Sequence, residues 1–211
     1  MKGLLLSLAT AALVVGAVYL LKLSEPEAVP SGAPPGEARI RGEEPSAGAG
    51  AAGAAREGAE GSLRDRLLRT SAKEAGVEPV RGVWGVVMER GYPKGVATVI
   101  ALADGTASLH LSNGGSVLGG REYPPARMAA RTLCERAADS LGGMVAAQEF
   151  PRPAEKRVRF YVLTTDGVRA AEGDLLAHLR DGGRDPLEGL MGAGDAVVEA
   201  LKDATNKGLL R

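Results

Sequence analysis

Hydrophobic and polar positions divide the chain into three parts. Residues 3–21 contain no charged residue and are strongly apolar, whereas residues 23–61 have five prolines, many Gly and Ala and few large apolar residues. From Ser62 onward, apolar residues recur at the short spacings of secondary structure. The pattern predicts a transmembrane anchor or signal segment at 1–22, a disordered linker at 23–61 and one globular domain at 62–211.

Short apolar runs in the C-terminal part predict strands. Asp104-Gly105 and Asp166-Gly167 each join two such runs, and Asp-Gly between β-capable segments is typical of a tight hairpin turn. Residues 91–95, Gly-Tyr-Pro-Lys-Gly, are expected to form a loop that closes the first strand. The predicted strands are residues 83–88, 96–103, 106–111, 144–148, 158–164 and 168–171.

Helical spacing appears before, between and after these strands. Ser62 with Asp65 predicts a helix start and a helix that ends near Gly76, and Asp185-Pro186 opens another apolar stripe that reaches Leu201. Residues 124–141 begin with two prolines and then carry apolar residues every three or four positions. The order predicts an α+β fold, with helices packed on one central, mainly antiparallel sheet of about five to six strands.

This order of elements resembles the roadblock, longin and profilin-like group of small sheet-and-helix modules. That resemblance implies a docking platform or a dimerising scaffold, and it covers about 130 residues by topology alone. Separately, residues 84–89, Trp-Gly-Val-Val-Met-Glu, and 112–115, Ser-Asn-Gly-Gly, with Gly91-Tyr92-Pro93 and Asp104-Gly105-Thr106, are similar to a run in uncharacterised bacterial proteins.

The N-terminal apolar segment predicts attachment to a membrane. Nineteen helical residues span about 28 Å, close to the thickness of a hydrocarbon core. A cleaved signal peptide remains the alternative, with Val15-Gly16-Ala17 as the cleavage region. We expect a single-pass protein whose domain lies outside the cytoplasm, or a secreted or periplasmic protein if the segment is cleaved.

Charge and cysteine content argue against several classes of function, namely nucleic-acid binding, disulfide-stabilised folds and cysteine-based zinc sites. Residues 1–61 contain 5 of the 26 Lys and Arg and 7 of the 26 Asp and Glu, which leaves 21 basic against 19 acidic residues for the domain. This balance argues against nucleic-acid binding. Cys134 is the only cysteine, so neither an intrachain disulfide nor a cysteine-based zinc site can form. No metal or cofactor is expected, and Cys134 is predicted to be a buried, unreactive thiol.

A glycine-rich run is the first candidate site. It lies between a predicted strand and a predicted helix, where exposed N–H groups can bind an anion, yet it lacks the P-loop and dinucleotide-binding spacings. The alternative is a structural turn. The candidate contact residues are Ser112, Asn113, Gly114, Gly115, Ser116, Gly119 and Gly120.

Aromatic and histidine side chains give further candidates. Tyr92 and Tyr123 stand beside prolines in expected loops, where they either contact a partner or pack against the sheet edge, while Trp84 and Phe160 are expected in the core. A hydrolytic set of Ser116, His110 and Asp166 is conceivable but lacks any sequence signature. His110 and His178 are interpreted as partly exposed surface residues.

Together these patterns favour a membrane-tethered, non-enzymatic binding or scaffold module. It would act through a protein partner or a homodimer, using its sheet edge or a helix face. The alternative is a sensor domain that binds a small molecule or an anion through residues 112–120, and a hydrolytic enzyme is a third hypothesis.

Overall fold

The domain is built on one antiparallel sheet of seven strands. The computed structural model describes residues 63–175 and 187–210, all of which belong to one compact unit. The strand order is β4-β3-β2-β1-β6-β7-β5, and every neighbouring pair is antiparallel. The strands are β1 (Val83–Tyr92), β2 (Gly95–Leu102), β3 (Ala107–Leu111), β4 (Ser116–Val117), β5 (Val145–Ala147), β6 (Arg157–Thr164) and β7 (Gly167–Asp174).

The predicted α+β class with a single antiparallel sheet is therefore confirmed, but the strand number is higher than expected. The seventh strand is β4, which has only two residues. Two residues cannot show the alternation by which a strand is read from sequence. Its place at the sheet edge depends on pairing with β3, where Ser116 lies opposite His110.

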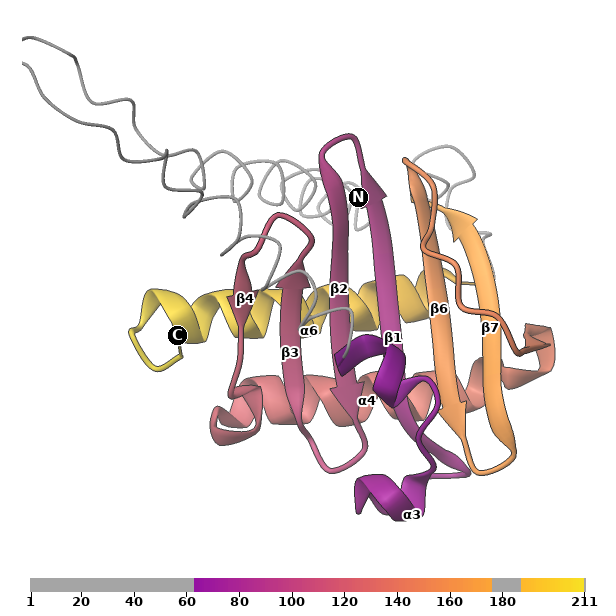
Figure 1. The fold of residues 1–211 in the computed structure, drawn as a ribbon. Coiled ribbons are helices and arrows are strands. Elements are labelled where there is room, and N and C mark those ends of the chain that lie inside the picture. Colours follow the sequence, from indigo (N-terminus) through magenta and orange to yellow (C-terminus); the bar gives the residue numbers. More distant parts are fainter. Residues whose placement is uncertain (1–62, 176–186, 211) are drawn as a thin grey trace, which may run out of the picture. The chain divides into compact units, whose positions relative to one another are not determined.

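Two long helices lie side by side across one face of the sheet, behind the strands in Figure 1. They are α4 (Pro124–Ser140) and α6 (Glu188–Asn206), and 3-10 turns η1 (Gly120–Glu122) and η2 (Leu141–Gly143) flank α4. The predicted helix at 124–141 is thus present. The expected start of the last helix, Asp185-Pro186, lies outside the described residues.

Both hairpins predicted from Asp-Gly pairs are present. Gly105 has φ 91° and Gly167 has φ 117°, values that glycine adopts without the steric cost a side chain would bring. The connection between β1 and β2 differs from the prediction. Residues 91–95 are not one loop, because β1 continues to Tyr92 and pairs with Gly95 across a turn of only Pro93 and Lys94.

Two short helical pieces precede β1, and the first of them lies in front of the strands in Figure 1. Residues 63–67 are helical, and α3 (Ala72–Ala75) follows after a break. The single helix expected from Ser62 to Gly76 is therefore wrong. Ser71 starts a new helix, because its side chain accepts from the Glu74 N–H while the Glu74 carboxylate accepts from the Ser71 N–H.

Each face of the sheet carries its own apolar core. The rear core lies between the sheet and the helices α4 and α6, and it includes Phe160, which is completely buried. The front core is smaller, and Trp84 lies in it beneath the helical pieces. The predicted core positions of Trp84 and Phe160 are confirmed. The front core comprises Leu68, Val77, Trp84, Val87, Ile100, Leu102, Tyr161 and Leu163.

Within residues 63–175 and 187–210, no helix is both long enough and apolar enough to cross a membrane. The predicted membrane segment at 3–21, the linker at 23–61 and His178 all lie outside the described residues.

Candidate functional site

The buried polar side chains of the described residues gather at one place on the front of the sheet. They are Arg64, Glu89, Thr98, Ser108 and His110, each no more than 7% exposed. Strand pairing places Glu89 opposite Thr98 and Thr98 opposite His110, so the three form a row across β1, β2 and β3. Burying polar groups costs free energy unless they find partners, so a concentration of them identifies this row as the candidate site.

Arg64 and Glu89 form the most buried interaction of this cluster. The Arg64 Nε donates to Glu89 Oε1 and the Nη2 donates to Glu89 Oε2, both at 2.7 Å. Thr98 Oγ1 adds a hydrogen bond of 3.3 Å to the same carboxylate. Burial alone would lower the pKa of Arg64, but the hydrogen bonds and charge of Glu89 outweigh it and raise that pKa.

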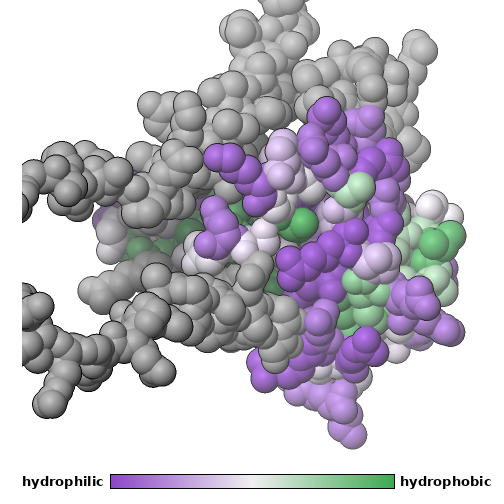
Figure 2. Space-filling view, turned by 45° about the horizontal axis from the view of Figure 1, so that its top comes forward, coloured by the Kyte–Doolittle hydropathy of each residue, from purple (hydrophilic) through white to green (hydrophobic). Residues whose placement is uncertain are grey.

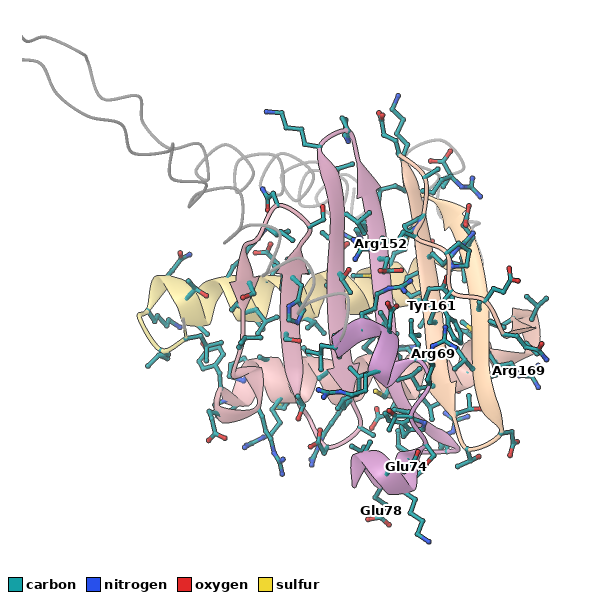
Figure 3. The ribbon with its side chains drawn as sticks, in the orientation of Figure 1. Arg69, Glu74, Glu78, Arg152, Tyr161 and Arg169 are labelled. Atoms are coloured by element: carbon teal, nitrogen blue, oxygen red, sulfur yellow. The ribbon has the colours of Figure 1, made fainter. Side chains whose placement is uncertain are left out.

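Residues 148–156 cross the front of the sheet above this pair. Arg64 Nη2 donates to the Phe150 carbonyl at 2.8 Å, and Tyr161 Oη donates to the Pro151 carbonyl at 2.6 Å. Gly91 makes the crossing possible, since a Cβ there would lie 1.9 Å from the Ala154 carbonyl oxygen. The crossing segment thereby brings Arg152 over the front face (Figure 3).

A shallow cleft opens beside the polar row. It is small and open to solvent, and both polar and apolar side chains line it. Arg152 is exposed, and no acidic side chain of residues 63–175 or 187–210 forms an ion pair with it. The cleft residues are Arg64, Thr98, Ile100, His110, Leu111, Ser112 and Arg152.

His110 is buried in the cleft wall rather than partly exposed, so the interpretation as a surface residue is wrong. Its Nε2 lies 3.0 Å from Ser108 Oγ. Burial lowers the pKa of His110, because the charged ring would lose hydration. The sequence alone could not show this, since burial of His110 depends on packing over β3.

Ser112 is the one residue of the glycine-rich run that reaches the cleft. Its Oγ accepts from the Val96 N–H at 2.8 Å, and the Ser112 N–H donates to the Val96 carbonyl. The next residues form the turn between β3 and β4, in which Gly114 has φ 96° and donates its N–H to Leu111. The N–H groups of Ser112 and Gly114 are therefore not available to an anion.

The remaining residues of the run have structural surroundings. Asn113 is exposed in the turn, Gly115 accepts from the Leu111 N–H, and Ser116 lies in β4. Gly119 precedes η1 with φ 88°, and Gly120 is buried where a Cβ would clash with Ala107 and Leu201.

The two candidate tyrosines lie away from the cleft. Tyr92 belongs to β1, is half-buried and packs against the rear core, and burial raises its pKa. Tyr123 precedes α4 and donates its hydroxyl to Asp203 of α6, while Lys207 donates to Tyr123 Oη at 3.1 Å. These contacts tie the start of α4 to the end of α6.

The conceivable hydrolytic set is not assembled. Ser116 and His110 are cross-strand neighbours, but Asp166 lies in the β6–β7 turn, and β2 and β1 separate β3 from β6. Cys134 is completely buried, as expected, and burial raises its pKa to about 12. No group of residues suited to a metal ion occurs in the described part of the chain.

A second feature is an apolar strip on the front face at the β5 edge. Val145 is 70% exposed and lies opposite Ala170, while Ala147 lies opposite Val168, and these pairs continue the front core toward the edge. Phe150 packs against the same core. Figure 2 shows hydrophobic surface on the side of the molecule that carries β7, amid mostly hydrophilic residues. We call Val145, Ala147, Phe150, Val168 and Ala170 the edge strip.

No protein-family model, curated protein or solved structure matches the chain. The likeness to roadblock, longin and profilin-like modules therefore stays a prediction from the order of elements.

Proposed function

We propose that the protein is a membrane-tethered, non-enzymatic binding module that contacts a protein partner, or a second copy of itself, at the β5 end of its sheet. The observation that carries the proposal is the exposure of Val145. A valine that is 70% exposed on an edge strand, opposite Ala170, which packs against the front core, is surface that a partner can bury.

The backbone of β5 supports the same role. β5 pairs with β7 on one side, and no other described strand pairs with its outer side. An extended segment of a partner can add to such an edge, with backbone hydrogen bonds for affinity and side-chain contacts for specificity. Val145 faces the front of the sheet and would meet alternate side chains of the added strand.

Elsewhere on the described surface the exposed large apolar residues are Leu118, Met128 and Leu209, none of which belongs to the edge strip. The outer face of α4 is charged, with Arg127, Arg131 and Glu135 among its residues. Met128 stands alone there as an exposed apolar residue. A single exposed apolar residue needs no partner, whereas the edge strip joins several. The tether, expected at residues 3–21, would hold this surface close to a membrane.

A photo-reactive amino acid at position 145 tests the proposal in native membranes. The full chain, expressed with this residue in place of Val145, is expected to give a discrete cross-linked product on irradiation. An adduct with the mass of two chains would identify a homodimer, and a larger or smaller defined adduct would identify a different partner. The matched control carries the same residue at Met128, which is 67% exposed on α4. The absence of any adduct at 145, or equal adducts at 145 and 128, would contradict the proposal.

A further inference from the structure

We propose that residues 63–77 are an autoinhibitory cover. They pack on the inner part of the same apolar face whose outer end is the edge strip, and a partner that binds the strip displaces them. The cover consists of the helical piece at 63–67, α3 and the residues on either side of α3. The inference rests on the proposed function, because the partner that displaces the cover is the one that binds the edge strip.

The apolar face continues without a break from the cover to the edge strip. Strand pairing aligns one row of apolar residues across five neighbouring strands, each residue opposite the next: Ile100, Val87, Tyr161, Ala170 and Val145. The first three belong to the front core and are no more than 3% exposed, whereas Val145 is 70% exposed. The row is therefore covered at one end and open at the other.

Few buried residues attach the cover to the sheet. Leu68 and Val77 are its two members of the front core, and the other six residues of that core belong to β1, β2 and β6. The helix α3 itself buries no residue. On the rear face, by contrast, α4 buries five residues and α6 buries six. Stabilisation by apolar contact grows with the area removed from water, so the cover is held less strongly than the rear helices.

Polar contacts of the cover reach the edge strip itself. Arg64 Nη2 donates to the Phe150 carbonyl at 2.8 Å, and the Arg69 guanidinium lies 5.7 Å from the centre of the Phe150 ring. Phe150 is a member of the edge strip. A partner that engages the strip therefore competes with these contacts for Phe150.

The backbone of the cover depends on its attachment. Helical segments of five and four residues are too short to be stable alone in water, so the cover unfolds when it leaves the sheet. Opening then frees the N–H groups of Leu68 and Val77, which donate to the carbonyls of Arg64 and Ala72. The amides of β1 stay protected in the open state, because β1 pairs with β2 and β6.

Hydrogen exchange of the full chain in detergent micelles, resolved to single amides and measured without a partner, tests the cover. The Val77 amide is expected to exchange at least about tenfold faster than the β1 amide of Met88. Leu68→Ala should speed exchange at Val77 about thirtyfold or more, because a nearly completely buried leucine is truncated. Leu201→Ala, which truncates a buried leucine of the rear core, is the control and should speed exchange at Met88 without changing Val77.

Three results would overturn the inference. They are exchange at Val77 as slow as at Met88, no change at Val77 in Leu68→Ala, and equal acceleration of Val77 and Met88 in Leu201→Ala. Each of them would show that the cover does not open separately from the sheet as one unit. Because these measurements use the chain alone, they leave the proposed contact at the edge strip standing.

Cross-linking from position 145 in native membranes tests the inhibition. Arg69→Gln loosens the cover without altering the buried core, and a cation–π contact of this kind corresponds to about a two- to fivefold change in the opening equilibrium. The adduct yield should rise by up to that factor when the partner is limiting. Arg66→Gln, an exposed arginine of the same helical piece, is the control and should give the wild-type yield. Equal yields in the two variants would overturn the inference alone, whereas no adduct in any variant would overturn the proposed function as well.

Discussion

The buried pair of Arg64 and Glu89 gives the sharpest prediction about stability. Arg64→Met removes the cation while leaving an apolar side chain of similar length over the front core. Glu89 is completely buried, so its carboxylate would lose both charge-assisted hydrogen bonds without gaining water. Breaking a buried ion pair in this way costs about 3–5 kcal/mol. A typical domain has about 5–15 kcal/mol of stability in total.

The double variant Arg64→Met with Glu89→Leu removes both charges. Comparing it with Arg64→Met separates the destabilisation caused by an unpaired buried charge from the stabilisation that the intact ion pair provides. Replacing both members of a buried ion pair by apolar residues is often nearly neutral. Here some loss should remain, because Thr98 and the Phe150 carbonyl also lose partners, each worth about 1 kcal/mol. The double variant is therefore expected to recover about 1–3 kcal/mol of the stability that Arg64→Met alone loses.

Urea unfolding of the full chain, followed by tryptophan fluorescence, measures these changes. Trp84 is the only tryptophan and lies in the front core, 1% exposed, so it reports on the region that the substitution disturbs. Arg81→Met is the control, because its ion pair with Asp139 is exposed on both sides and should contribute less than about 1 kcal/mol. If Arg64→Met lowers the free energy of unfolding no more than Arg81→Met does, the reasoning is refuted.

Three further predictions concern other parts of the domain. Gly91→Ala should destabilise by at least about 1–3 kcal/mol in urea unfolding, because its Cβ would overlap the Ala154 carbonyl, whereas Gly189→Ala, with open space around it, should be neutral or stabilising. The Cys134 thiol, whose pKa burial raises to about 12, should resist alkylation at about pH 8.5 in the folded protein and react quickly in urea; equal rates would contradict its burial. Because the folded pKa of His110 is lowered, the folded state takes up fewer protons, and stability should fall as pH drops from about 7 to 5; His110→Gln should lessen that fall, and an unchanged slope would contradict the prediction.

Much of the fold could be predicted from local patterns. The Asp-Gly pairs correctly predicted two hairpins, and the apolar stripe of residues 124–141 correctly predicted a helix. These predictions were possible because each signal lies within a short stretch of sequence. The errors occurred where an element depends on distant contacts or on a competing local signal. β4 depends on its pairing with β3. Apolar spacing predicted one continuous helix before β1, but Ser71 caps a new helix there.

The candidate site was harder to predict, because it is assembled from five separate segments. Arg64, Glu89 and Arg152 were not singled out, although Glu89 gave one usable signal. It is an acid in the apolar strand β1, on the same face as Val87, and such a residue needs a buried partner. Its partner Arg64 is 25 residues away in the chain, so no local pattern could connect the two.

The central claim is that the edge strip around Val145 is a contact surface for a protein. The most direct measurement is quantitative affinity capture of the full chain from native membranes, with wild type, Val145→Asp and Met128→Asp compared side by side. The two substituted positions are equally exposed, so the charge is introduced at matched sites. We predict that a co-purifying protein, or a second copy of the chain, is retained by wild type and by Met128→Asp and is lost from Val145→Asp. Equal recovery with all three proteins would contradict the claim.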